Sequence, residues 1–216
     1  MSESRRLKAD PRSAQPAVSR KGVSKRSHPT LPHEVRIIGG LWKRSKLPVA
    51  DAPGLRPTPD RVRETLFNWL GQDLAGWRCL DAFAGSGALG FEAASRGAAQ
   101  VVLLERDRRL AESLRLTAER LHATTLRIEC ADALAWMARS EPARFDLVLL
   151  DPPFDAPLLE PSLSAAVRLL APSGLVYAES SKELGSADVE GFGLVVRRHG
   201  RAGAVHFHLL ERIGGP

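Results

Sequence analysis

The sequence predicts an α/β fold, a doubly wound sheet of seven strands in which the last strand runs antiparallel. Beyond Gly76, apolar runs of strand length alternate with amphipathic helical stretches, a pattern typical of a mostly parallel sheet covered on both faces. A glycine-rich turn follows the first of these runs. Only residues 199–203 separate the last two runs, which predicts a hairpin and therefore a reversed strand near one edge.

These patterns set the expected elements of the core. Strands are expected at Arg78–Phe83, Gln100–Glu105, Thr125–Cys130, Phe145–Asp151, Gly174–Glu179, Phe192–Arg198 and Ala204–Leu210. Helices are expected at Leu89–Arg96, Arg108–Leu121, Asp132–Ala138 and Pro157–Leu170.

A small β element is predicted before this core, within residues 34–57. Two strand-like runs, Val35–Ile38 and Lys46–Val49, flank a pair of glycines. The following Pro-Thr-Pro sequence introduces a helix, with Thr58 expected at the N-cap and Pro59 at the first helical position.

That helix has an apolar stripe made of Val62, Leu66, Trp69 and Leu70. We therefore expect Arg61, Arg63 and Glu64 to point towards solvent or a ligand. Residues 34–216 are predicted to form one domain, in which 58–216 are the catalytic core.

The positive charge is concentrated in the first third of the chain. The formal net charge is +6 over 216 residues. Residues 1–33 hold eight Lys/Arg against two acids, and residues 34–63 hold seven against three, so the remainder is net negative. Such asymmetry is typical of a protein that meets a polyanion at one end. Residues 1–33 lack an apolar period and are predicted to be a disordered basic tail, either a solvated segment or an arm that touches the polyanion.

Composition argues against several other classes of protein. No apolar run approaches the length of a membrane span, and the N-terminus has no apolar secretory segment. Cys79 and Cys130 are interpreted as buried thiols of a cytosolic protein. His206 and His208 alternate along the last expected strand, where surface placement accounts for them, so no metal site is predicted.

The glycine-rich turn Asp81–Gly90 predicts a cofactor loop. Its glycines let the backbone approach a ligand closely, and Glu105 ends the next strand where it can accept hydrogen bonds from two ribose hydroxyls. NAD enzymes use a similar glycine pattern. The carboxylate of Asp81 would repel a pyrophosphate but attract a methionyl ammonium, which favours S-adenosylmethionine over NAD. The alternative is that the glycines serve only a tight strand-to-helix turn.

A third acid, Asp132, follows the strand that ends at Cys130. Its carboxylate is expected to accept the adenine amino proton while the Ala133 amide meets a ring nitrogen, although Asp132 is equally suited to cap the next helix. The residues expected to hold the cofactor are Asp81, Phe83, Ala84, Gly85, Gly87, Glu105, Arg106, Asp132 and Ala133.

The tetrapeptide Asp151, Pro152, Pro153, Phe154 closes a buried apolar run and is the expected catalytic loop. A nucleobase amino group is a poor nucleophile because its lone pair is delocalised into the ring. The Asp151 carboxylate and the Pro152 carbonyl are expected to accept its two hydrogens and aim the nitrogen at the methyl donor, with the prolines stiffening the loop. Phe154 offers a face on which the nucleobase stacks.

No strong proton acceptor is required beforehand, because the amino proton becomes acidic as the nitrogen gains its methyl group. The alternative is a proline-rich turn in which Asp151 is only a cap.

Together with two further segments, these motifs resemble the RsmD-type methyltransferases, which modify guanine N2 in 16S ribosomal RNA of the small subunit. The further segments are Val35–Gly40 and Leu55–Leu70. The resemblance implies a Rossmann-like class I methyltransferase fold that uses S-adenosylmethionine, with the N-terminal element and the basic helix face holding RNA. By this analogy the RNA-binding residues are Arg36, Lys43, Arg44, Arg56, Arg61 and Arg63. The long basic extension before residue 34 departs from the family.

The expected protein is therefore a monomeric cytoplasmic enzyme acting on 16S ribosomal RNA, within an assembling or assembled subunit. Two alternatives stay open. One is an amino-methyltransferase acting on adenine or cytosine of DNA or RNA, and the other is a non-catalytic RNA-binding assembly factor.

Overall fold

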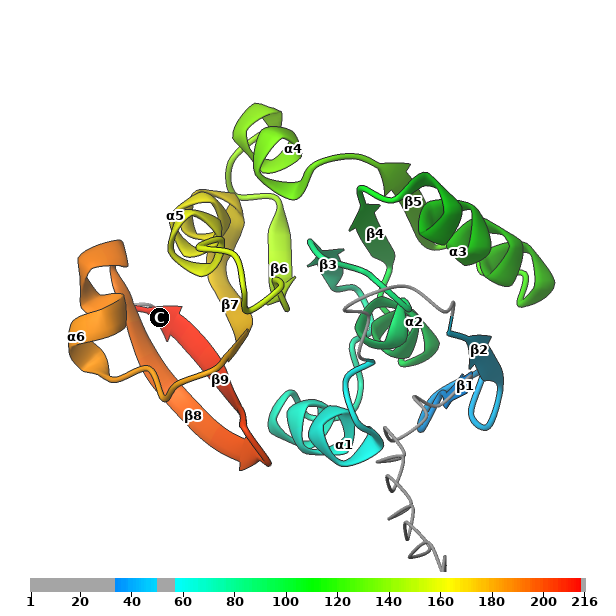
Figure 1. Ribbon diagram of the computed structural model, residues 1–216, viewed down its shortest axis with the longest axis horizontal. Helices are drawn as coiled ribbons and strands as arrows, with labels where there is room; N and C mark the ends of the chain where they lie inside the picture. Colours follow the sequence, from blue (N-terminus) through cyan, green and yellow to red (C-terminus); the bar gives the residue numbers. More distant parts are fainter. Residues whose placement is uncertain (1–33, 50–56, 215–216) are drawn as a thin grey trace, which may run out of the picture. The chain divides into compact units, whose positions relative to one another are not determined.

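The computed structural model describes residues 34–49 and 57–214, whose main element is a seven-stranded sheet with the order β5-β4-β3-β6-β7-β9-β8 (Figure 1). Strands β5, β4, β3, β6 and β7 pair in parallel, and β9 is antiparallel to both β7 and β8. The predicted fold class, including its reversed last strand, is confirmed. The strands are β3 (Arg78–Asp81), β4 (Gln100–Glu105), β5 (Leu126–Cys130), β6 (Phe145–Leu150), β7 (Leu170–Ser180), β8 (Leu194–Ala202) and β9 (Val205–Arg212).

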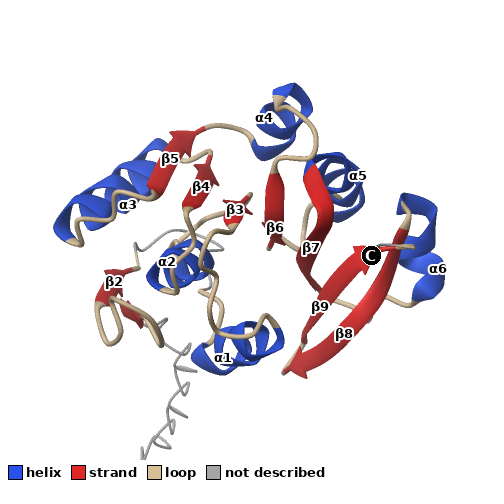
Figure 2. Ribbon diagram, turned by 180° about the vertical axis from the view of Figure 1, so that it is seen from behind, coloured by secondary structure: helices blue, strands red, loops and turns tan. Residues whose placement is uncertain are grey.

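Helices cover both faces of the sheet. One face packs against α1, α2, α3 and a two-stranded β element, and the other packs against α4, α5 and α6 (Figure 2). The helices are α1 (Asp60–Trp69), α2 (Ala88–Ser95), α3 (Arg108–Arg120), α4 (Ala133–Arg139), α5 (Leu159–Leu169) and α6 (Ser186–Val189). None of the helices in the described part of the chain is long and apolar enough to cross a lipid bilayer.

Strand β6 shows why the central runs are continuously apolar. Leu147 and Leu149 enter the core beneath α1 and α2, whereas Val148 and Leu150 enter the core beneath α4 and α5. Alternate side chains of a strand point to opposite faces, so from Leu147 onwards, where β6 is buried on both faces, every position is apolar.

The sheet has a topological switch point between β3 and β6. From β3 the chain proceeds outwards to β4 and β5, and then returns to β6 on the other side. In open α/β sheets, ligands bind outside the carboxyl ends of the strands at such a point. Asp81 and Asp151 stand at the carboxyl ends of these two strands.

The small β element consists of β1 (Glu34–Arg36) and β2 (Lys46–Pro48), paired antiparallel. Its buried side chains, Val35, Ile37 and Leu47, join the core that contains α1 and α2. The element therefore packs onto the same face of the sheet as the glycine-rich loop.

Several expected details are corrected by the structure. Thr58 is not a helix cap, because α1 begins at Asp60 after Pro59 and has no side-chain cap. The expected helix up to Leu170 stops at Leu169, where β7 already begins. Helix α6 and the 3₁₀ turn Glu190–Phe192 were not predicted, since both are too short to show a hydrophobic period.

Two side chains also differ from expectation in burial. Cys79 is buried as predicted, but Cys130 is exposed because it ends the edge strand β5. His208 is fully buried instead of lying at the surface, and its Nε2 accepts the Leu184 N–H at 3.0 Å. Burial lowers the pKa of His208 to about 4, so the ring is neutral near pH 7.

Candidate active site

The glycine-rich loop joins β3 to α2, and packing explains its glycines. Gly87 has φ +78°, and a Cβ there would lie 2.6 Å from Leu114 of α3. A Cβ on Gly90 would lie 2.9 Å from Leu103 and 3.0 Å from Asp81 Oδ2. Both positions therefore need glycine to let α2 approach the sheet and α3.

Asp81 is almost completely buried behind this loop. Its Oδ2 accepts the Gly90 N–H at 2.9 Å. Burial, reinforced by the charges of Glu105 and Glu179, raises the pKa of Asp81 to about 7, although the bond from Gly90 lowers it in part. No Lys or Arg of the described residues contributes to that pKa. A buried carboxylate that meets no cation among the described residues is suited to meet the cation of a ligand.

Glu105 lies at the mouth of the same loop. Its two oxygens accept the Gly85 N–H at 2.9 Å and the Asp107 N–H at 2.8 Å. An ionised carboxylate has about four acceptor sites, so Glu105 retains room for further hydroxyl donors.

The cap proposed for Asp132 is present. Its Oδ1 accepts the Ala135 N–H at 2.9 Å at the start of α4, and its side chain is exposed at the carboxyl end of β5. Ala133 behind it is buried. One oxygen of Asp132 is thus used by the helix, and the geometry leaves the other for a ligand.

The loop after β6 places Asp151 next to the segment that precedes α1. Thr58 Oγ1 donates to Asp151 Oδ2 over a long 3.5 Å. Pro152 is buried and Pro153 is exposed, and the Phe154 ring is 46% exposed. A large aromatic ring left in solvent beside an acid is suited to stack on a planar ligand.

A third acid that the sequence reasoning missed, Glu179, joins this edge. It lies near the carboxyl end of β7, is 4% exposed, and its Oε1 accepts the Tyr177 hydroxyl at 2.8 Å. Burial raises the pKa values of both Asp151 and Glu179, and the Glu179 charge raises that of Asp151 further. The sequence signal was available, because Glu179 closes an apolar run as Glu105 and Asp151 do.

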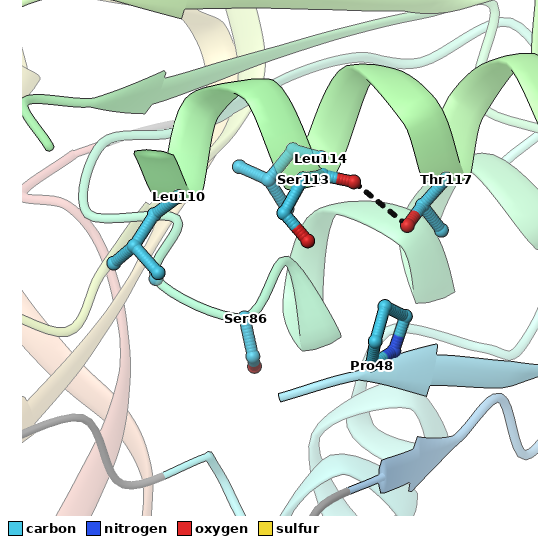
Figure 3. A pocket seen from close by; sticks show the side chains of 7 residues that line it. Pro48, Ser86, Leu110, Ser113, Leu114 and Thr117 are labelled. Atoms are coloured by element: carbon cyan, nitrogen blue, oxygen red, sulfur yellow. Dashed lines mark hydrogen bonds between the residues drawn. The ribbon is translucent and has the colours of Figure 1, made fainter. Parts of the chain in front are cut away.

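A separate shallow pocket lies on the outer side of the glycine loop (Figure 3). It is lined by β2, the loop and α3, through Pro48, Gly85, Ser86, Leu110, Ser113, Leu114 and Thr117. None of the buried acids lines it, so this pocket is not where the chemistry described above would take place.

One group of possible metal ligands exists in the described residues. Glu183, His199 and His206 bring ligand atoms within 4.8 Å of one another, and the two histidines are hydrogen-bonded at 3.0 Å. His199 of this group stacks on His208. His208 pairs with Ala178 of β7, which faces the opposite side of the sheet from Tyr177 and the buried acids. This group is therefore separate from the buried acids.

The residues predicted to bind RNA differ in their exposure to solvent. Arg36, Lys43, Arg44 and Arg61 are exposed, with Lys43 and Arg44 in the turn between β1 and β2. Arg56 lies outside the described residues, as does the basic tail 1–33. Arg63 is fully buried, so the expectation that it faces solvent or RNA is wrong.

Arg63 instead joins a buried ion network centred on Glu92 of α2. Its Nη1 lies 3.1 Å from Glu92 Oε2, and its Nη2 contacts Asp60 and the Arg36 carbonyl at 2.6 and 2.8 Å. Glu92 also pairs with Arg96 and accepts the Ile38 and Gly39 N–H groups at 2.8 Å each. Helical periodicity placed Arg63 on the polar face of α1, but the β1–β2 element covers that face.

The sheet order, the glycine loop, the acid that ends β4 and the Asp-Pro-Pro-Phe loop after β6 together define a class I methyltransferase. The family model described as conserved hypothetical protein 95 matches residues 35–211. The chain belongs to this family, which is also that of the small-subunit ribosomal RNA methyltransferase D relatives.

Two such relatives illustrate the similarity. The ribosomal RNA small subunit methyltransferase D of Escherichia coli is 43% identical over 83% of this chain and 90% of its own length. That of Haemophilus influenzae is 44% identical over 72% of this chain and 83% of its own. The solved structure of the Escherichia coli protein yhhF, described as a methyltransferase, aligns with a TM-score of 0.72 and 37% identity, covering 83% of this chain and 98% of that one.

Proposed function

We propose that this protein transfers a methyl group from S-adenosylmethionine to the N2 amino group of a guanine in 16S ribosomal RNA of the small subunit. The observation that carries the proposal is the position of Asp151. Its carboxylate stands at the switch point of the sheet, one strand away from Asp81 and the glycine loop. Methyl donor and acceptor would therefore meet at one edge. The names of the Escherichia coli and Haemophilus influenzae relatives support ribosomal RNA as the substrate.

The residues around the glycine loop fit the methyl donor, which supplies an electrophilic methyl group on a sulfonium. Asp81 is a buried carboxylate that meets no cation among the described residues, and it suits the methionyl ammonium. Glu105 has acceptor sites left for the ribose hydroxyls. The free oxygen of Asp132 and the Ala133 amide suit the adenine, while Phe83, Ala84, Gly85, Gly87 and Arg106 form the surrounding backbone.

Asp151 and the Pro152 carbonyl would orient the acceptor. Each accepts one hydrogen of the amino group, which turns the nitrogen lone pair out of conjugation and towards the methyl group. Phe154, exposed beside them, stacks on the base. Asp151 is thus the catalytic residue and Phe154 the platform that holds the guanine in place.

The RNA itself would be held by the β1–β2 element and α1. Arg36, Lys43, Arg44 and Arg61 are exposed there, and Arg56 and the tail 1–33 add further positive charge. Neutralised phosphates release counterions, so binding to this region is expected to weaken as salt rises. We propose a monomeric cytoplasmic enzyme that acts on an assembling or assembled small subunit.

The decisive experiment measures which nucleoside becomes methylated. Small subunits from a strain that lacks its own family member are incubated with the protein and isotope-labelled S-adenosylmethionine, and the RNA is digested to nucleosides. Labelled N2-methylguanosine is expected. Label in N6-methyladenosine or N4-methylcytosine would establish the alternative base instead, and binding of RNA without any label would establish an assembly factor.

A further inference from the structure

The carboxyl edge of the sheet holds more negative charge than amino-group orientation needs. Leu149 of β6 is in register with Asp81 of β3 and with Tyr177 of β7. One step of two residues further along, Asp151 comes to stand beside Glu179. These acids continue the sheet face that carries Cys79, Leu147 and Leu175, so they gather on the side covered by α1 and α2.

The groups that surround Asp151 can be named element by element. From β7 come Glu179 and Tyr177, from β3 Asp81, and from the segment before α1 the Thr58 hydroxyl. The residue of β9 in register with Glu179 is Phe207, which carries no charge. No Lys or Arg of the described residues contributes to the pKa of any of the three acids.

Glu179 differs from Asp151 in its support. The Tyr177 hydroxyl donates to Glu179 at 2.8 Å, and both side chains are buried on β7, two residues apart on one face. The hydrogen bond from Tyr177 favours the charged form of Glu179 and partly offsets the effect of burial on its pKa. Among the described residues, Asp151 accepts only the long bond from Thr58, so it binds a proton more readily than a supported carboxylate does.

We propose that Glu179 is a positioning residue for Asp151: held by the Tyr177 hydroxyl, it places a second negative charge beside Asp151, so that Asp151 receives the proton displaced from the acceptor amino group. The inference rests on the proposed function and deepens it. Glu179 acts through Asp151 and does not itself touch the base.

The step balances in atoms and charge. The nitrogen lone pair forms the N–C bond, the electron pair of the broken S–C bond stays on sulfur, and one N–H proton passes to Asp151. A positive charge therefore leaves the sulfonium as another arrives on Asp151, and the net charge of the site is unchanged. The Glu179 charge raises the proton affinity of Asp151 and so favours the arrival of the proton there.

The test has one readout that does not depend on activity. Aspartate carboxyl carbons are labelled with ¹³C and titrated by NMR in the full-length protein, with Asp151→Asn used to assign the Asp151 signal. In Glu179→Gln the midpoint of Asp151 is expected to fall by about one pH unit or more, because a like charge has been removed. In Tyr177→Phe it should fall by less, because Glu179 then competes better for the shared proton.

The second readout is the pH dependence of methyl transfer to the small subunit. The rate should fall as pH drops through the pKa of Asp151, because the protonated group cannot receive the proton. This fall in rate at low pH, the acid limb of the profile, is expected to shift to lower pH in both Glu179→Gln and Tyr177→Phe. In Glu179→Gln the plateau rate should also be reduced. The matched control Glu183→Gln removes a charge from the exposed loop after β7 and should leave the limb in place.

An unshifted Asp151 midpoint and an unshifted acid limb in Glu179→Gln, with only a uniform loss of rate, would overturn the proposal and leave Glu179 a structural residue. If Glu179→Gln does not fold, Tyr177→Phe decides, since it keeps the ring that packs near Phe207. Failure of the wild-type protein to methylate RNA would sink the proposed function, yet the titration would still decide whether Glu179 sets the proton affinity of Asp151.

Discussion

Two groups of acids lie on the same side of the sheet and differ in how their charges are matched. Glu92 is fully buried, and its oxygens receive Arg63, Arg96 and two backbone N–H groups. Within the described residues, Asp81, Asp151 and Glu179 accept hydrogen bonds only from N–H and O–H groups, and burial is the main cause of their raised pKa values.

The difference distinguishes an acid that stabilises the fold from acids that are available to a ligand. Burying a charge is costly unless it is paired, so the Glu92 network must be complete before a ligand arrives. The three acids at the carboxyl edge are incomplete by the same standard. They meet no cation among the described residues, and the proposed methyl donor carries two positive groups.

Removing the acid from the complete network should give the largest effect. Glu92→Gln leaves the buried guanidinium of Arg63 without its main counter-charge, and we expect a loss of about 3–5 kcal/mol in the free energy of unfolding. Urea unfolding followed by circular dichroism measures it. As the matched control, Glu112→Gln breaks an exposed pair with Arg115 and should cost less than about 1 kcal/mol. Equal losses in the two variants would contradict the comparison.

Removing an acid from the incomplete group should affect rate and spare the fold. Asp151→Ala is expected to lower the methyl-transfer rate by about 10²–10³-fold, the usual effect of losing one preorganised group. Asp151→Asn should retain more activity, because its amide oxygen still accepts one amino hydrogen although it cannot take the proton. Single-turnover rates on small subunits test this. Wild-type rates in the Ala variant would place the catalytic site elsewhere.

Asp81 should make cofactor binding depend on pH. Its raised pKa means that the stability the ligand-free protein gains from protonated Asp81 is full below the ordinary carboxyl pKa of 3.8 and is lost as pH rises from there to about 7. A methionyl ammonium reverses this preference. The affinity for S-adenosylhomocysteine should therefore fall by up to tenfold for each pH unit below about 7. Calorimetry checks the slope, which Asp81→Asn should flatten while weakening binding at every pH.

The smallest effect is expected at Glu105, which is already supported by two backbone N–H groups. Glu105→Ala removes the acceptors for the ribose hydroxyls, and S-adenosylhomocysteine should bind roughly tenfold more weakly. NAD should give no binding heat with either protein. Binding of NAD without binding of S-adenosylhomocysteine would overturn the assignment of the cofactor.

Local sequence patterns predicted most of the fold and two of the acids at the carboxyl edge, but they did not predict the Glu92 network. Strand runs, the glycine turn and the Asp-Pro-Pro-Phe loop are read within a few neighbouring residues, and Asp81 and Asp151 were found in that way. The Glu92 network was missed because its partners are distant in sequence, with Arg63 29 residues and Ile38 54 residues away. Glu179 closes an apolar run as Glu105 and Asp151 do, but it comes to stand beside Asp151 only through the pairing of β7 with β6, which its own segment does not reveal.

The contacts of Glu92 also fix the position of the β1–β2 turn relative to the glycine loop, and this affects how the proposed RNA substrate would be bound. Glu92 belongs to the helix that begins at the glycine loop, and it grips the backbone of Ile38 and Gly39 immediately before the turn that carries Lys43 and Arg44. A Cβ on Gly40 would lie 1.8 Å from the Ser95 carbonyl oxygen, so the element sits directly against that helix. Phosphates bound by this turn would therefore lie at a fixed distance from the methyl group of the donor. The enzyme would select its guanine by the distance between the bound phosphates and the base.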